Sequence, residues 1–204
     1  TLDRSSAASD VYKRQPEGIS ATWKPRAVRV VVLDRLPNIF LPGETCAHNR
    51  LAMTLLYTHP SGFQHVTPPS HPEQVARLEA VLAALEGMDL DRREAPEAPD
   101  DEILRCHPAS YLSLVRRKLP DQGWTMLDAD TYLSPGSLAA ARHAVGGVCA
   151  AVDAVLAGQA PNAFVAMRPP GHHTERTKAM ALKMQNPIAI GALRALDHHG
   201  PVSY

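Results

Sequence analysis

Residues 137–173 read SLAAARHAVGGVCAAVDAVLAGQAPNAFVAMRPPGHH, and this stretch decides the fold. In residues 137–156 apolar side chains recur with helical spacing, which predicts a long helix that Ser137 can cap. Residues 163–167, AFVAM, form a short continuous apolar run, which is typical of a strand buried on both faces of a sheet. A long helix that leads into a buried strand, followed by a loop and another helix, predicts an α/β fold.

The flanking sequence supports the same class. Residues 55–57 predict a short strand. Residues 72–85 and 109–119 predict helices, because their apolar residues recur at steps of three and four. Pro72 suits the first turn of its helix, where a missing N–H does no harm. A last helix is predicted over residues 187–198.

The two ends of the chain differ from its middle. Residues 1–15 and 201–204 contain no apolar period, and we interpret them as a non-native leader and tail, with disordered native termini as the alternative. Residues 16–52 are an uncertain extension or translated upstream sequence. The run RVVVL at residues 29–33 predicts a strand within it. Whether the protein starts at Met53 stays open.

The composition argues against several function classes. The chain has 21 basic and 21 acidic residues, so no broad basic field would attract nucleic acid. No uninterrupted apolar run approaches the roughly 18 residues that span a membrane, and residues 1–15 lack the apolar centre of a secretory signal. Cys46, Cys106 and Cys149 form no CxxC pair, so we expect a reducing, cytoplasmic location. We interpret Cys149 as core packing.

The string RPPGHH, residues 168–173, follows the buried strand directly. Ligands of parallel α/β sheets bind beyond the carboxyl ends of the strands, so this loop lies where catalytic groups are found. Two prolines stiffen the loop, and Gly171 lets the backbone turn sharply or pass close to another segment. Histidine titrates near neutral pH and can take a proton from water and return one to a leaving amine. A lone His-His pair is a weak signal, but in this position His172 and His173 are candidate catalytic residues.

Four stretches resemble the histone deacetylase and acetylpolyamine amidohydrolase family, in the order found in that family. They are YTHPSGFQHVTPPSHPEQVARL at 57–78, LRCHPASYL at 104–112, LDADTYLSPGSLAAA at 127–141 and NAFVAMRPPGHH at 162–173. The resemblance implies a parallel-sheet arginase–deacetylase-like fold, truncated to roughly its first half. Residues 53–200 would be the amino-terminal part of a deacetylase domain.

The same resemblance implies a zinc-dependent amidohydrolase that removes acetyl groups from acetyl-lysine or acetylpolyamine substrates. Zinc would polarise the acetyl carbonyl and activate a water molecule. His173 would act as general base and then acid, while His172 would hold charge or share the proton. Asp130 would accept hydrogen bonds from the substrate backbone. The alternatives for Asp130 are a solvated turn carboxylate and competition from Asp128.

One stretch departs from the family pattern. Where the family reads G-F-C, two further residues and then N-N or N-D, this chain has ALKMQNP at residues 181–187. Ala181 replaces the glycine, Leu182 the phenylalanine that walls the substrate tunnel, and Lys183 the cysteine. Burial of an unpaired lysine is costly, so a rearranged loop, an altered site and a sequence error all stay open. We keep Ala181 and Leu182 as candidate substrate-binding residues.

The metal ligands that the resemblance implies, in a D-x-H-H-G motif and a later aspartate, are missing from the sequence, as is a later tyrosine. Aligning HHG at 198–200 places Leu196 at a ligand position, so we interpret His198 and His199 as a helix terminus. We therefore expect zinc only in a full-length parent, no metal ligand here and an inactive fragment.

Two alternatives stay open for the function. One is an inactive relative that binds acyl ligands, and the other is a non-enzymatic protein-binding module. We expect no nucleic-acid or membrane partner, and the oligomeric state is open.

Overall fold

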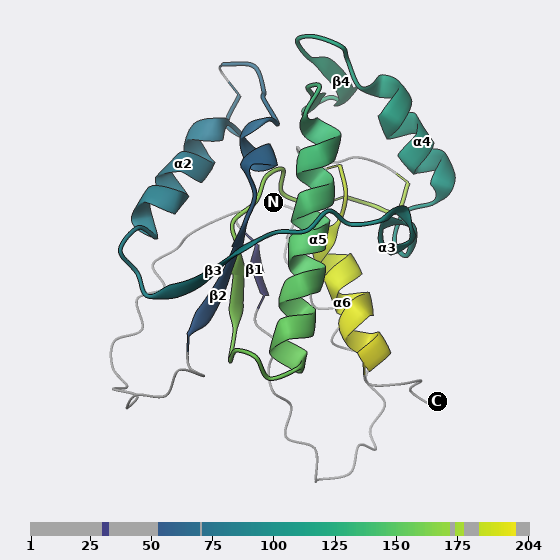
Figure 1. Cartoon of the computed structure of the whole chain (residues 1–204). Helices are drawn as coiled ribbons and strands as arrows, with labels where there is room; N and C mark the ends of the chain where they lie inside the picture. Colours follow the sequence, from purple (N-terminus) through teal and green to yellow (C-terminus); the bar gives the residue numbers. More distant parts are fainter. Residues whose placement is uncertain (1–29, 33–52, 70, 172–173, 178–183, 199–204) are drawn as a thin grey trace, which may run out of the picture.

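The computed structural model describes residues 30–32, 53–69, 71–171, 174–177 and 184–198, in which helices and strands alternate (Figure 1). The α/β class predicted from the sequence is confirmed. In chain order the elements are β1 Val30–Val32, β2 Thr54–Thr58, the 3-10 helix η2 Pro60–Phe63, α2 Val75–Ala84, β3 Leu90–Glu94, α3 Asp100–Leu104, α4 Ala109–Lys118, β4 Thr125–Asp128, β5 Thr131–Leu133, α5 Ser137–Leu156, β6 Ala163–Val165 and α6 Pro187–His198.

The main sheet has the strand order β1-β6-β2-β3, and every neighbouring pair in it is parallel. Parallel neighbours need a crossover connection, and the long helix α5 lies in the connection that leads to β6. The strands predicted over residues 29–33, 55–57 and 163–167 are present as β1, β2 and β6. A separate antiparallel pair, β4 and β5, forms a small hairpin.

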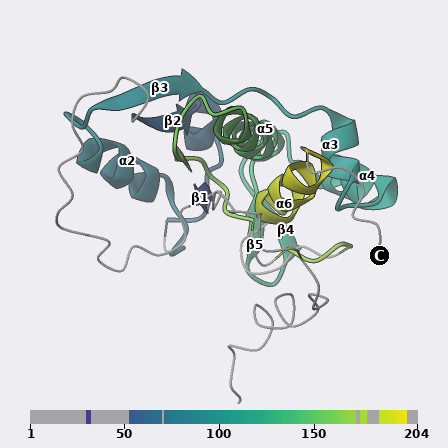
Figure 2. The same ribbon diagram turned by 90° about the horizontal axis from the view of Figure 1, so that it is seen from below.

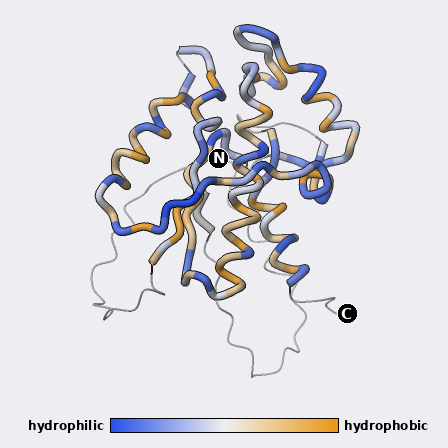
Figure 3. Tube along the Cα trace, in the orientation of Figure 1, coloured by the Kyte–Doolittle hydropathy of each residue, from blue (hydrophilic) through white to orange (hydrophobic). Residues whose placement is uncertain are grey.

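Strand β3 was not predicted. Its sequence LDRRE has neither β-branched residues nor apolar alternation, and it forms a hydrophilic stretch in Figure 3. It pairs with β2 at the edge of the sheet. Charged side chains are common on edge strands because they discourage further strand pairing. Residues 90–94 therefore form a strand because they pair with β2, and their own sequence does not indicate this pairing.

Alternate residues of the central strands face helices on opposite sides of the sheet. Leu55 and Tyr57 of β2 and Val165 of β6 pack in one cluster with α5. Leu56 of β2 belongs to a second cluster with Leu78 of α2. Side chains of a strand alternate between its two faces, so each face is covered by its own helix. Figure 2 shows α2 and α5 as separate helices beside the strands. Full burial of a leucine such as Leu55 contributes about 1.5–3 kcal/mol.

Helix α5 matches its predicted bounds and forms much of the core. Among the described residues it is long and apolar enough to cross a membrane by length and composition, although Arg142 and Asp153 interrupt its apolar run. Two thirds (67%) of its most apolar window is buried inside the protein. Packing against β6 and α6 accounts for the apolar composition, as in the core helix of a globular domain.

Two predicted details of helix starts are wrong. Pro72 lies outside α2, which begins at Val75, because the backbone of the N-cap residue Gln74 is extended (φ −146°, ψ 162°). Ser137 does not cap α5, whose N-cap residue is Gly136. The Ser137 hydroxyl instead accepts a hydrogen bond from the Ser134 N–H (2.7 Å), just before the helix.

Candidate active site

Arg168 anchors the start of the loop that follows β6. The residue is 3% exposed, and its Nε donates to Glu73 Oε1. Its Nη1 donates to the carbonyl oxygens of His65 (3.0 Å) and Gly62 (3.3 Å). Glu73 is equally buried and also accepts from Arg77 Nη1 at 2.6 Å. The guanidinium therefore ties the RPPG segment to η2 and to the approach to α2.

His65 lies in the same buried polar region. It is 2% exposed, and its Nδ1 lies 2.7 Å from Ser137 Oγ at the start of α5. Burial, together with the positive charge of Arg168 and the nearby His71, lowers the pKa of His65 to about 3. The imidazole is therefore neutral in the folded protein at neutral pH.

Acid should destabilise the protein through His65. The pKa is about 6.5 in the unfolded chain and about 3 in the folded one, so the unfolded state binds the extra proton between these values. The stabilising contribution is complete above pH 6.5 and is lost as the pH falls toward 3. Between pH 7.5 and 5.5 we expect His65 alone to lower the free energy of unfolding by about 1.4 kcal/mol.

Urea unfolding at the two pH values measures this loss. The matched variant His65→Gln should show a shallower pH dependence than the wild type. Equal slopes would mean that His65 does not take up the proton on unfolding.

Gly171 and Thr174 flank the tandem histidines and are held close together. The Thr174 N–H donates to the Gly171 carbonyl at 3.1 Å. A Cβ on Gly171 would lie 2.0 Å from Pro187 Cδ and 2.1 Å from the Gln185 carbonyl oxygen. A larger residue would therefore collide with the segment that leads into α6. The requirement for glycine here comes from this close approach, which is one of the two explanations that the sequence left open.

Four of the five predicted site residues, His172, His173, Ala181 and Leu182, lie outside the described residues. Asp130 is described, and it is exposed in the turn between β4 and β5. Its backbone carbonyl accepts from His71 Nε2 at 3.3 Å. The role of the Asp130 carboxylate in substrate binding stays a prediction, with the solvated turn as its alternative.

The described part of the connection from β6 to α6 is also held by α4 and by His107, which precedes α4. His107 is 1% exposed, and its Nδ1 donates to the Arg176 carbonyl at 3.0 Å. Its Nε2 accepts from the Asn186 N–H at 3.1 Å. The Tyr111 hydroxyl donates to the Met184 carbonyl at 2.7 Å. His107 and Tyr111 both lie in the stretch 104–112 that resembles the family, but the sequence gives no signal for the groups that they bond to.

The side-chain amide of Gln185 is buried. The residue is 3% exposed, and neither polar atom of its amide has a hydrogen-bond partner within the part of the chain that the structure describes. An unsatisfied buried polar group destabilises by roughly 1–3 kcal/mol. We therefore expect Gln185→Met, which nearly conserves the volume, to raise the free energy of unfolding by a comparable amount in thermal or urea melts. The exposed control Gln122→Met should stay within about 0.5 kcal/mol. Equal effects of the two changes would contradict the prediction.

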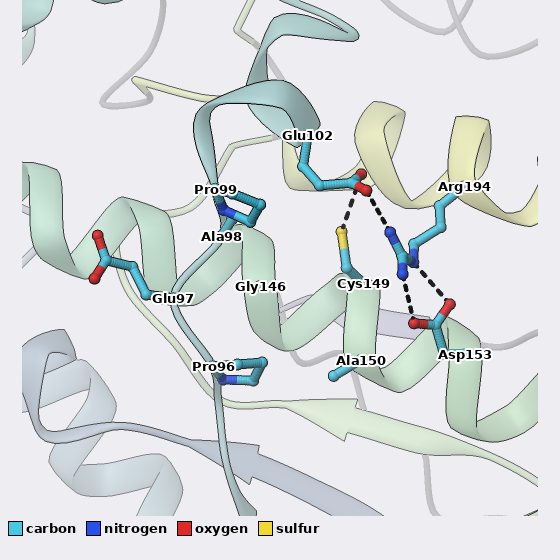
Figure 4. Close-up of a pocket in the computed structure, with 10 residues that line it drawn as sticks. All are labelled: Pro96, Glu97, Ala98, Pro99, Glu102, Gly146, Cys149, Ala150, Asp153 and Arg194. Atoms are coloured by element: carbon cyan, nitrogen blue, oxygen red, sulfur yellow. Dashed lines mark hydrogen bonds and ion pairs between the residues drawn. The ribbon is translucent and has the colours of Figure 1, made fainter.

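A pocket lies between α3, α5 and α6, away from the loop that follows β6 (Figure 4). Its volume is about 250 Å³, and the predicted site residues do not line it. Arg194 lies between Asp153 and Glu102 and bonds to both. Burial and the nearby Glu102 raise the pKa of the Cys149 thiol to about 12, so this cysteine is unreactive. Its burial confirms the prediction that Cys149 is core packing. The pocket is thus lined by a structural ion-pair network.

The described residues do not fit a zinc site. Among them, no three His, Cys, Asp or Glu side chains come together as metal ligands. His198, at the end of α6, instead lies 3.0 Å from Asp153 Oδ1. Burial opposes ionisation of Asp153, but the hydrogen bonds from Arg194 and His198 outweigh it and lower the pKa of the carboxyl group. We therefore assign no reaction step through a metal ion to these residues.

The sequence model of the histone deacetylase domain family matches residues 71–204 of this chain. The chain belongs to the histone deacetylase domain family. A histone deacetylase-like amidohydrolase of Pseudomonas aeruginosa is 41% identical to this chain over 131 residues, which cover 63% of the chain and 34% of the relative. The polyamine deacetylase HDAC10 of Homo sapiens is 34% identical over 142 residues, which cover 65% of the chain and 21% of HDAC10.

The deacetylase fold is matched as well. The crystal structure of the HDA15 HD domain superposes with a TM-score of 0.67 at 26% sequence identity, covering 72% of this chain and 44% of that one. The parallel-sheet arginase–deacetylase-like fold expected from the sequence is thereby confirmed. The chain spans less than half the length of each of these three relatives.

Proposed function

We propose that this chain is the amino-terminal part of a cytoplasmic, zinc-dependent deacetylase that hydrolyses the N-acetyl amide of acetyl-lysine or acetylpolyamine. Membership of the family supports this activity, and the names of two relatives point to deacetylation and amide hydrolysis. The observation that carries the proposal is the anchoring of Arg168. This buried residue holds the start of the loop that follows the parallel strand β6, and His172 and His173 come after residues 169–171 in the sequence.

Each candidate residue has a proposed role. His173 takes a proton from the attacking water and returns it to the leaving amine, and His172 shares that proton. Asp130 accepts hydrogen bonds from the substrate backbone. Ala181 and Leu182 form part of the wall along the substrate chain. The buried anchor at Arg168, shortly before the histidines in the sequence, supports these roles, because catalysis depends on holding groups in a fixed geometry.

The residues that the structure describes do not supply the ligands that a catalytic metal ion requires. A catalytic zinc site usually has three protein ligands, and the described residues bring no such set together. We propose that the ligands follow residue 204 in a longer protein, in a D-x-H-H-G motif and a later aspartate. On that proposal the chain as given neither binds zinc tightly nor hydrolyses acetyl-lysine.

An inactive relative that binds acyl ligands is the second candidate. The change of Ala181, Leu182 and Lys183 from the family pattern favours it, because Leu182 stands where the family has the phenylalanine that walls the substrate tunnel. A substrate wall altered in this way would still allow an acyl ligand to bind but would weaken its turnover.

The test compares this chain with the longer coding sequence of the same gene. Both are purified, and bound zinc and the hydrolysis of an acetyl-lysine peptide and an acetylated polyamine are measured with and without a chelator. We expect zinc and chelator-sensitive hydrolysis in the longer protein alone. Acyl-ligand binding without hydrolysis would favour the inactive relative. A longer gene without D-x-H-H-G would remove the proposed activity, and turnover by this chain would overturn the assignment of the missing ligands.

A further inference from the structure

The segment between Thr174 and Asn186 begins and ends at nearly the same place. The Asn186 side-chain amide donates to the Thr174 carbonyl at 3.1 Å, and Thr174 Oγ1 lies 3.5 Å from the Gln185 carbonyl oxygen. Gly171 packs against Gln185 and Pro187 at the same point. The two ends of the segment are therefore in direct contact with each other.

One side chain from elsewhere in the protein bonds to both ends. His107 lies between α3 and α4, where its backbone N–H donates to the Ile103 carbonyl at 3.0 Å. Its imidazole bonds to Arg176 at the first end and to Asn186 at the second, 69 and 79 residues away in the sequence. The ring thus bridges the two ends from a part of the chain that is buried and fixed.

The partners of His107 determine its protonation. A backbone carbonyl can only accept, so Nδ1 must carry the proton that it donates to Arg176. A backbone N–H can only donate, so Nε2 must be bare to accept from Asn186. The ring is therefore the neutral Nδ1–H tautomer. Burial lowers the pKa of His107, against the opposing effect of the hydrogen bond to Arg176, and this favours the neutral form.

We propose that His107 is a positioning residue that pins both ends of the segment after the tandem histidines, and so sets the geometry of the active-site loop. The inference rests on the proposed function for its catalytic consequence. His172 and His173 precede the first pinned end in sequence, and Ala181 and Leu182 lie between the two ends. Releasing either end would therefore change where these groups meet a substrate, without removing any of them.

The pin itself can be tested in this chain without any activity. ¹⁵N NMR of the imidazole should show the neutral Nδ1–H tautomer for His107. In His107→Phe, which keeps a ring but removes both nitrogen contacts, the Asn186 amide should exchange with solvent at least about tenfold faster, while the buried amides of α5 keep their rates. A protonated or Nε2–H ring, or unchanged exchange at Asn186, would overturn the proposal.

Two partial variants and one control sharpen the test. His107→Asn can still donate toward Arg176, and His107→Gln can still accept from Asn186, so only the glutamine should keep the Asn186 amide protected. The control is His143→Phe, which also removes a hydrogen bond from a histidine Nδ1 to a backbone carbonyl, that of Ala95 (2.7 Å), but does not touch the loop. It should leave exchange at Asn186 unchanged. Loss of protection in the control would show a general loosening, which contradicts a specific pin.

The catalytic consequence is measured in the longer protein. His107→Phe should lower kcat by roughly ten- to a hundredfold with little change in KM, because misplacement by about 1 Å can reduce the rate by that much. His107→Gln should recover part of the loss, and His143→Phe should not change kcat. An unchanged kcat in folded His107→Phe would overturn the catalytic consequence. If the wild type is inactive, the proposed function fails, while the tautomer and the exchange rates still decide whether the pin exists.

Discussion

Replacing Glu73 with alanine is expected to lower the free energy of unfolding by about 3–5 kcal/mol, because the change leaves Arg168 buried without its carboxylate. The pair is nearly inaccessible to water: the side chains of Arg168 and Glu73 are 4% and 2% exposed. Nη2 of Arg168 already lacks a partner among the described residues, so nothing there replaces the lost carboxylate. Urea unfolding of the purified chain measures the loss.

An exposed ion pair provides the control. Asp91 and Arg93 lie 2.8 Å apart with side chains 40% and 35% exposed, and exposed pairs contribute at most about 1 kcal/mol. Asp91→Ala should therefore have a small effect. A second variant, Glu73→Met with Arg168→Met, should be more stable than Glu73→Ala, because it leaves no unpaired buried charge. Equal stability of Glu73→Ala and Asp91→Ala would show that the buried pair does not hold the loop.

In the longer protein, His173→Ala is expected to reduce turnover by about a hundred- to ten-thousandfold, the range typical of general acid–base groups. Zinc content should stay unchanged, because the proposed role of His173 is to move a proton and not to bind the metal. The control His198→Ala removes a half-exposed histidine that pairs with Asp153 at the end of α6, and it should leave turnover intact. Unchanged turnover in His173→Ala with zinc retained would mean that the base is misassigned.

The local sequence pattern was sufficient to predict an element where that element is long and its apolar residues recur periodically. The predicted helices over residues 137–156 and 187–198 have the same bounds as α5 and α6. Both present an apolar stripe to the core, and such a stripe can be recognised without knowing what it packs against. The strand at residues 163–167 was recognised for a related reason, because a parallel strand covered on both faces is continuously apolar.

The local pattern was insufficient to predict a segment whose conformation depends on another segment that it contacts in the fold. Residues 90–94 form a strand because β2 offers them hydrogen bonds, not because their charged side chains favour one. The start of α2 was placed too early, since the backbone of Gln74 is extended and the side chain of Glu73 before it turns inward to Arg168. The hairpin of β4 and β5, which presents Asp130, is also absent from the local signal.

The sequence by itself determined the α/β class, the place of RPPGHH beyond a buried parallel strand and, through its motifs, the resemblance to the deacetylase family. These are properties of neighbouring residues, so periodicity and local strings carry them. Only the tertiary structure decided how the loop is held: Glu73 and Arg168 are 95 residues apart, and His107 is 69 and 79 residues from the backbone groups it bridges. Pairing of buried charges and backbone groups depends on which segments the fold brings together. The sequence around a single residue does not indicate a partner that is distant along the chain.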